Sequence, residues 1–183
     1  MMRKLCALLL RLMGWTVDSG LVPEAKCIIL GAPHTSMLDF VVAFLYYYSQ
    51  GGNAKCMVKK DLFVPVLGPI IRAMGGIPVD RTNPSTLVRS VIKEFDNAES
   101  LHLAIAPEGT RKPVRNWKTG FHLIARSANI PVYLAYFDWG TKHVGFFTKV
   151  ELTDDAKADM RRIQDLYASR NLVGRHKDNY TTG

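Results

Sequence analysis

The sequence contains only three cysteines among its 183 residues, and no two of them form a CxxC pair. Cys6, Cys27 and Cys56 stand at unrelated spacings, whereas a disulfide framework or a zinc site uses cysteines in sets with short, regular intervals. Structural disulfides also belong to oxidising compartments. The cysteine pattern therefore argues against both kinds of site and favours a reduced, cytosolic setting.

Long hydrophobic runs are lacking as well. The apolar run near the N-terminus covers only residues 5–10, far short of the roughly 20 apolar residues that a membrane-spanning helix needs. No small residues follow it at a cleavage site, so a signal peptide is not expected. Arg3, Lys4 and Arg11 are mixed with the leucines, which predicts an amphipathic helix. We assign it residues 1–17, and it can lie in the lipid interface or pack on the domain.

No low-complexity stretch, internal repeat or linker interrupts the chain, and 48% of its residues are hydrophobic, which suits one domain with a sizeable core. The formal net charge of +8 favours an anionic partner: nucleic acid, an acidic membrane face or phosphorylated small molecules. Nucleic acid is disfavoured because the sequence lacks a GxxxxGK(S/T) loop, an RNP-like aromatic set and zinc-finger spacing. The lack of a GxSxG elbow argues against a serine hydrolase.

Strand-like and helix-like patterns alternate along the chain. Pro78 lies within a short strand pattern at residues 77–79, which predicts an edge strand or the end of a strand. Residues 60–74 contain Pro65 and Pro69, so any helix there must be kinked or broken. Strands are expected at residues 27–30, 54–58, 77–79, 101–106, 131–137 and 144–150, and helices at 36–50, after Asn83, at 118–128 and from Thr153 to about Arg170. This order predicts an α/β fold, a single domain with a mixed, largely parallel sheet flanked by helices.

The segment after Leu30 carries the first candidate site, because ligands of such sheets bind beyond the carboxyl ends of the strands. It contains His34, and Asp39 falls in the first turn of the next helix. A carboxylate at this spacing can fold back onto the imidazole, fix its tautomer and leave the other ring nitrogen to accept a proton. Alternatively, Asp39 only caps its helix, since Ser36 stands at capping-box spacing from it, and His34 is an ordinary loop residue.

The second candidate segment follows the strand pattern at residues 101–106 and contains Glu108, Gly109, Thr110 and Arg111. Gly109 permits a tight turn, and Arg111 offers a planar fork that matches phosphate oxygens. The alternative is a solvated basic loop. Arg81 ends another strand pattern and is a second candidate phosphate ligand; there the alternative is a surface ion pair with its acidic neighbour, worth at most about 1 kcal/mol.

Together these motifs resemble those of the glycerolphosphate and lysophosphatidate acyltransferase family. Residues 34–39 match its first block, a histidine and an aspartate separated by four residues (HX4D). Residues 80–81 look like its second block, residues 108–111 match the third, and residues 130–132 are similar to the fourth. The resemblance covers about residues 26–136 in the order typical of the family.

The resemblance implies a glycerolphosphate-acyltransferase-like fold, with the acyltransferase domain at residues 18–170. Residues 171–183 follow as a polar tail, a composition typical of disorder. His34 would then be the general base and Asp39 would orient it, with no metal and no cofactor. The co-substrate would be acyl-CoA or acyl carrier protein, and the basic surface suits either anion.

The resemblance also implies that Arg81 and Arg111 hold the phosphate of the acceptor. Glu108, Gly109 and Thr110 belong to the same substrate-binding segment, where Glu108 either braces the loop or contacts the acceptor. The expected acceptor is a lysophospholipid, above all 1-acylglycerol-3-phosphate, and the expected location is the cytoplasmic face of the membrane, peripheral or monotopic. Two alternatives remain: an acyltransferase for another lyso-lipid, such as a lyso-aminolipid, and a basic module that binds lipid or nucleic acid without catalysis.

Overall fold

The structure, a computed structural model, describes residues 2–80 and 83–182, and its centre is a seven-stranded sheet. The strands are β1 (Thr16–Val17), β2 (Lys26–Ala32), β3 (Ala54–Lys59), β4 (Gly76–Val79), β5 (Leu101–Ile105), β6 (Val132–Asp138) and β7 (His143–Val150). They lie in the order β1-β7-β6-β2-β5-β3-β4. β7 runs antiparallel to β6, and every other neighbouring pair is parallel. The expected mixed, largely parallel sheet is therefore confirmed.

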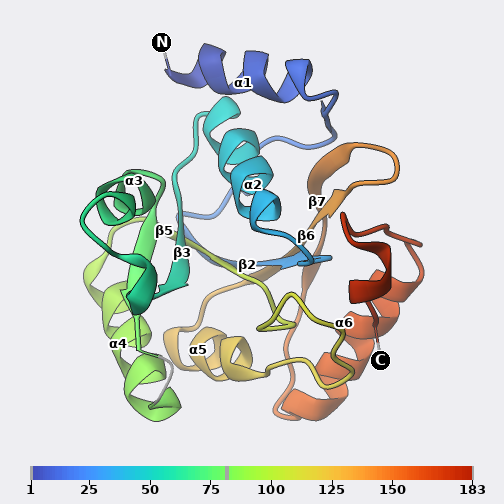
Figure 1. Cartoon of the computed structure of the whole chain (residues 1–183). Coiled ribbons are helices and arrows are strands. Elements are labelled where there is room, and N and C mark those ends of the chain that lie inside the picture. The colour runs from blue at the N-terminus through green and yellow to red at the C-terminus, as the bar shows by residue number, and fades with distance from the viewer. Residues whose placement is uncertain (1, 81–82, 183) are drawn as a thin grey trace.

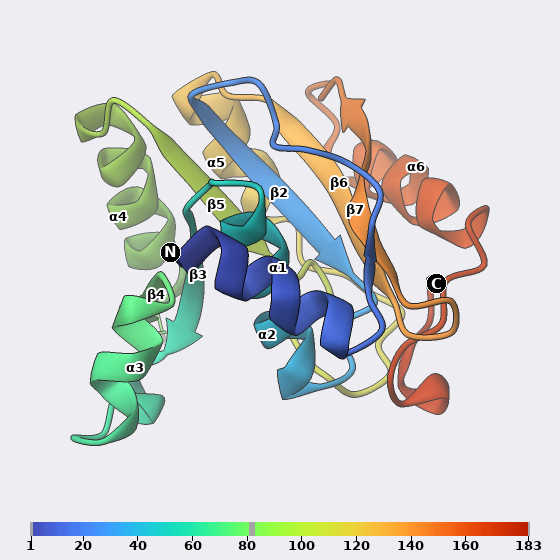
Figure 2. The same ribbon diagram turned by 90° about the horizontal axis from the view of Figure 1, so that it is seen from above.

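Helices cover both faces of this sheet. They are α1 (Met2–Leu12), α2 (Met37–Ser49), α3 (Leu67–Ala73), α4 (Pro84–Asn97), α5 (Gly120–Ala128) and α6 (Ala156–Ala168), with short 3-10 turns η1 (Lys60–Leu62) and η2 (Lys177–Asn179). Figure 1 shows α2 on one face with α1 stacked upon it, and α4, α5 and α6 on the other face. The view from above in Figure 2 places α3 on the same side as α1 and α2, beside β4 at the edge of the sheet.

The core is divided by the sheet, and β2 shows why its sequence is continuously apolar. Ile28 and Leu30 are fully buried in the cluster beneath α5 and α6, whereas Cys27 and Ile29 are buried in the cluster beneath α2. Successive side chains of a strand point to opposite faces, so a strand covered on both sides needs apolar residues at every position. This central strand then delivers the loop that carries His34.

Two local expectations based on proline are confirmed. β4 lies at the edge of the sheet and, among the residues that the structure describes, pairs only with β3, a position where Pro78 is tolerated. Residues 60–74 form η1, a turn and then α3, so no continuous helix crosses this segment. Pro65 falls in the turn between the two pieces, where its missing N–H and fixed φ are tolerated.

The N-terminal helix is shorter than the range 1–17 assigned from sequence. α1 ends at Leu12, and Gly14 adopts a left-handed φ of 78°. Trp15 is buried, and Thr16–Val17 then pair with β7 as the edge strand β1. A glycine that accepts a left-handed φ ends the helix there and redirects the chain into the sheet. Among the residues that the structure describes, no helix is long and apolar enough to cross a membrane.

The C-terminal residues 171–182, expected as a disordered polar tail, pack on the domain instead. The backbone N–H of Val173 donates to Asp138 Oδ1 at 2.9 Å. Leu172 and Tyr180 pack against the core cluster beneath α6. The expectation was wrong because it relied on side-chain polarity, whereas this segment is held largely by its backbone groups and by two apolar contacts.

Candidate active site

Two loops that carry the sequence motifs lie side by side at one end of the sheet. β2 and β5 are parallel neighbours, with Leu30 opposite Ile105, so both chains leave the sheet at the same end (Figure 1). We call residues 33–39 the HX4D loop and residues 106–112 the Glu108 loop. The parallel pairing alone brings together two segments that are about 70 positions apart in the chain.

The HX4D loop places His34 against Asp39. The distance from His34 Nδ1 to Asp39 Oδ2 is 3.4 Å. The His34 side chain is 24% exposed, while the Asp39 side chain is fully buried. This separation is somewhat longer than an ordinary hydrogen bond. The buried carboxylate faces one ring nitrogen, and the partly exposed imidazole is open to a ligand.

Asp39 is also the capping residue of its own helix. Its Oδ2 accepts the backbone N–H groups of Thr35 and Ser36, each at 2.7 Å. The Ser36 hydroxyl completes the capping box and accepts the N–H of Leu38 at 3.2 Å. The cap and the histidine pair, considered as alternatives from sequence, therefore use the same carboxylate, and the cap holds that carboxylate at the right position to meet the ring.

Trp139, which sequence reasoning missed, supplies the remaining contact of Asp39. Its indole N–H donates to Asp39 Oδ1 at 2.7 Å. Trp139 directly follows β6, which lies beside β2 in the sheet. No local pattern marks this residue, because it stands 100 positions from its partner. The strand order could have pointed to it, since the end of β6 must lie next to the HX4D loop.

Glu108 braces the HX4D loop from the other side. Its carboxylate oxygens accept the backbone N–H of His34 at 3.0 and 2.9 Å, and only 3% of the residue is exposed. Burial raises the pKa of Glu108 to about 8; the His34 N–H opposes this effect and the negative charge of Asp39 adds to it. From sequence, Glu108 was expected either to brace the loop or to contact the acceptor. In the structure it contacts the backbone of the HX4D loop.

The residues after Glu108 form an exposed basic turn. Gly109 has a left-handed φ of 67°, as the expected tight turn requires. The Thr110 hydroxyl accepts the N–H of Lys112 at 3.2 Å. Arg111 is exposed, and within residues 2–80 and 83–182 it forms no hydrogen bond or ion pair. Its guanidinium is thus available to an anion that reaches this end of the sheet.

The other proposed phosphate ligand, Arg81, lies outside the described residues. The preceding residue, Asp80, follows the edge strand β4 and forms an ion pair with Lys60 at 2.5 Å. Both partners are more than 40% exposed, at 58% for Lys60 and 45% for Asp80, so this pair contributes little to stability.

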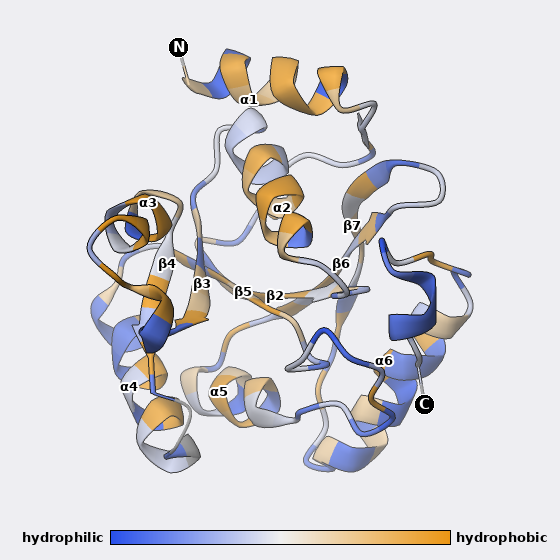
Figure 3. Cartoon of the chain, in the orientation of Figure 1, coloured by the Kyte–Doolittle hydropathy of each residue, from blue (hydrophilic) through white to orange (hydrophobic). Residues whose placement is uncertain are grey.

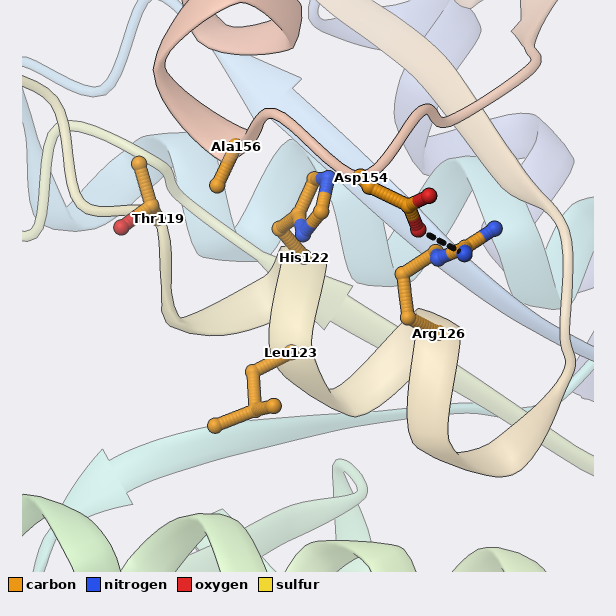
Figure 4. Close-up of a pocket in the computed structure, with 6 residues that line it drawn as sticks. All are labelled: Thr119, His122, Leu123, Arg126, Asp154 and Ala156. Carbon is orange, nitrogen blue, oxygen red and sulfur yellow. Dashed lines mark hydrogen bonds and ion pairs between the residues drawn. The ribbon is translucent and has the colours of Figure 1, made fainter.

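A pocket of about 330 Å³ lies away from these loops, between α5 and the start of α6 (Figure 4). His122 lines it and its Nε2 lies 3.0 Å from Asp159 Oδ2, a buried pair that ties α5 to α6. Neither His34 nor Asp39 lines this pocket. Among the described residues, no group of three or more His, Cys, Asp or Glu side chains is placed to hold a metal ion.

The family model described as Acyltransferase matches residues 17–137. The chain belongs to the acyltransferase family. The matched range includes the HX4D loop and the Glu108 loop, and it stops two residues before Trp139.

Two proteins similar to this chain are named as 1-acylglycerophosphate acyltransferases. A 1-acyl-sn-glycerol-3-phosphate acyltransferase of Pseudomonas aeruginosa is 29% identical over 119 residues, which cover 61% of this chain and 44% of the relative. The family member described here thus spans less than half the length of that relative. The crystal structure of the 1-acyl-sn-glycerophosphate acyltransferase PlsC of Thermotoga maritima matches 95% of this chain and 80% of its own, with a TM-score of 0.61 and 16% identity. This second likeness confirms the acyltransferase fold.

Proposed function

We propose that this acyltransferase-family protein transfers a fatty acyl group from an acyl thioester to the hydroxyl of a lysophospholipid, in the first place 1-acylglycerol-3-phosphate. The observation that carries the proposal is the pair of His34 and a fully buried Asp39, 3.4 Å apart, on a loop braced by Glu108. The names of the relatives from Pseudomonas aeruginosa and Thermotoga maritima, both 1-acylglycerophosphate acyltransferases, support the choice of acceptor.

In the proposed reaction, His34 acts as general base. Asp39 faces Nδ1, so Nε2 is the ring nitrogen that accepts the proton of the acceptor hydroxyl. The hydroxyl oxygen bonds to the thioester carbonyl carbon, the C–S bond breaks, and the released thiolate takes the proton from His34 to become a thiol. General base catalysis of this kind is typically worth about 10²–10⁴-fold, and correct placement of the hydroxyl contributes further.

The phosphate of the acceptor is assigned to the exposed basic turn. Arg111 has the planar fork that suits a phosphomonoester, and Lys112 and Lys118 add exposed positive charge beside it. Arg81, which lies outside the described residues, is the second proposed ligand. The strand before it in the chain, β4, runs parallel to β3, and β3 runs parallel to β5, the strand that leads into the Glu108 loop. A thioester on coenzyme A or on acyl carrier protein is also anionic, so the basic surface suits either donor.

A membrane surface is the proposed location of this reaction. α1 packs on α2 through Cys6 and Leu10 but exposes other leucines, among them Leu8 at 52% and Leu12 at 74%. Figures 1 and 2 place α3 on the same side, where Ile70 is 53% exposed, and Figure 3 shows both helices as largely apolar. Apolar side chains beside basic residues are typical of a helix lying in the lipid interface.

The catalytic part of the proposal is tested with a donor-by-acceptor activity matrix read by mass detection of the lipid product. Acyl-CoA and acyl carrier protein thioesters are combined with 1-acylglycerol-3-phosphate, other lysophospholipids and a lyso-aminolipid. We expect phosphatidate as the main product, and loss of about 10²-fold or more in kcat for His34→Ala. Full activity of folded His34→Ala protein would refute the assignment of His34 as general base. A higher activity with the lyso-aminolipid than with 1-acylglycerol-3-phosphate would refute the proposed acceptor.

The phosphate assignment is tested with Arg111→Ala. Loss of a charged hydrogen bond of about 1.5–3 kcal/mol should raise the acceptor KM by about 10-fold to 100-fold and leave the donor KM unchanged. Arg126→Ala removes an exposed arginine of α5, on the other face of the sheet, and serves as the matched control. A change in the donor KM alone would contradict the assignment.

The membrane assignment is tested by sedimentation with vesicles that contain anionic lipid. Leu8→Glu should weaken binding by about tenfold or more, because burial of a leucine side chain is worth about 1.5–3 kcal/mol. Leu123→Glu is the matched control, since Leu123 is 56% exposed but lies on α5 across the sheet. Equal binding by the two variants would place the membrane contact elsewhere.

A further inference from the structure

The C-terminal segment at residues 172–181 runs from α6 across the end of the sheet where the HX4D loop lies. The backbone N–H of Trp139 donates to the carbonyl of Val173 at 2.8 Å. Further along, the N–H of His176 donates to the Thr35 hydroxyl at 3.2 Å. The segment is therefore attached both to the residue that holds Asp39 and to the neighbour of His34. We call residues 172–181 the C-terminal strap.

The far end of the strap rests on Trp117, five residues after the Glu108 loop. Trp117 donates its indole N–H to the carbonyl of Thr181 at 3.2 Å, and its ring lies against that of Tyr180. The Tyr180 hydroxyl is buried and has no hydrogen-bond partner among the described residues. Burial, and then the negative charge of Glu108, raises the pKa of Tyr180. The strap thus spans from the HX4D loop to the vicinity of Glu108.

Trp139 is held in place by groups on both the strap and the β6–β7 turn. The Lys142 ammonium lies 4.2 Å from the centroid of its indole ring, and the Arg175 guanidinium of the strap lies 4.8 Å from it. The ring of Trp15 meets it edge-on at 5.0 Å. These contacts hold the ring in the orientation in which its indole N–H donates to Asp39 Oδ1.

From these contacts we propose that the C-terminal strap orients the catalytic pair: it fixes Trp139 and Thr35, which in turn hold Asp39 toward His34. Trp139 is then a positioning residue, because it acts on the reaction only through Asp39. The inference rests on the proposed general base. It concerns residues beyond 137, where the match to the family model ends.

Gly174 provides a direct way to displace the strap. It is buried, and a Cβ there would lie 2.6 Å from Thr35 Cγ2 and 2.9 Å from Thr35 Oγ1, although its φ is one that alanine can adopt. Gly174→Ala must therefore displace the Thr35 side chain or the strap, and either shift disturbs the contact between the strap and the HX4D loop. Gly20→Ala is the matched control, because Gly20 is exposed and its added Cβ would meet nothing within 4 Å.

The first measurement is kinetic, with 1-acylglycerol-3-phosphate and an acyl thioester. A misplacement of about 1 Å can cost about 10²-fold in rate, so Gly174→Ala should lower kcat by about 10-fold or more and change the acceptor KM by less than about 2-fold. Trp139→Phe, which keeps the ring and removes the N–H donor, should give a similar loss in kcat. On a His34→Ala background Trp139→Phe should cost nothing further, since both changes disable the same base.

The second measurement does not depend on activity. Hydrogen exchange of the Thr35 and Ser36 amides, which donate to Asp39, should be about tenfold faster in Gly174→Ala than in Gly20→Ala. Equal exchange in the two variants would overturn the proposal. So would full kcat in both Gly174→Ala and Trp139→Phe while His34→Ala is inactive. Activity retained in His34→Ala would instead refute His34 as the general base. The hydrogen-exchange result would then still test whether the strap positions Asp39.

Discussion

Glu108 should make the stability of this protein fall as the pH rises from about 4.5 to about 8. Its pKa is raised from 4.5 to about 8 in the folded protein, chiefly by burial. Below this window the carboxyl is protonated in both the folded and the unfolded chain. Within it, the unfolded chain releases the proton and the folded protein does not, so each pH unit favours unfolding by about 1.4 kcal/mol. Above about pH 8 both forms are ionised, and the total loss in unfolding free energy levels off at about 5 kcal/mol.

The variant Glu108→Gln isolates this effect, because the amide cannot titrate but keeps an oxygen that can accept the His34 N–H. Urea unfolding at pH 5, 6, 7, 8 and 9 gives the free energy of unfolding of both proteins. Loss of packing or of a hydrogen bond adds an offset that does not depend on pH. The test is therefore how the difference in unfolding free energy between the two proteins depends on pH. Between about pH 4.5 and pH 8, the unfolding free energy of the variant should rise relative to that of the parent protein by about 1.4 kcal/mol per pH unit.

The matched control is Glu94→Gln, a change of the same kind at an exposed position of α4. Its unfolding free energy should follow that of the parent protein at every pH. If Glu108→Gln and the parent protein differ by the same amount at pH 5 and pH 8.5, then Glu108 titrates alike in the folded and unfolded chain. The argument from burial would then be wrong.

Three substitutions away from the motif loops test the packing of α5 and α6. Tyr167→Phe removes a fully buried hydroxyl that contacts carbonyl groups of β2 and β6, and should lower the unfolding free energy by about 1–2 kcal/mol in urea. His122→Ala leaves the buried Asp159 without one of its partners and should cost about 2–4 kcal/mol. Arg126→Ala breaks only an exposed pair with Asp154 and should cost less than about 1 kcal/mol. A larger loss for Arg126→Ala than for His122→Ala would contradict the role assigned to burial.

Local sequence patterns predicted the elements that depend on near neighbours. The continuous apolar run of β2, the edge position of β4 and the break between η1 and α3 follow from side-chain periodicity and from proline geometry. The capping box of α2 could also be predicted, because Ser36 and Asp39 are three positions apart. The length of α1 was misjudged, since its apolar residues continue past the turn at Gly14.

The sequence by itself determined the fold class and the order of the motifs, and it marked His34, Asp39 and the segment that begins at Glu108 as the place for chemistry. Only the tertiary structure assigned the Glu108 carboxylate to the His34 backbone, brought Trp139 to Asp39, and placed the C-terminal strap across the HX4D loop. The reason is physical. These contacts join groups that lie 74, 100 and 141 positions apart in the chain, and it is the register of parallel strands, together with the docking of α6, that brings them within a few ångströms.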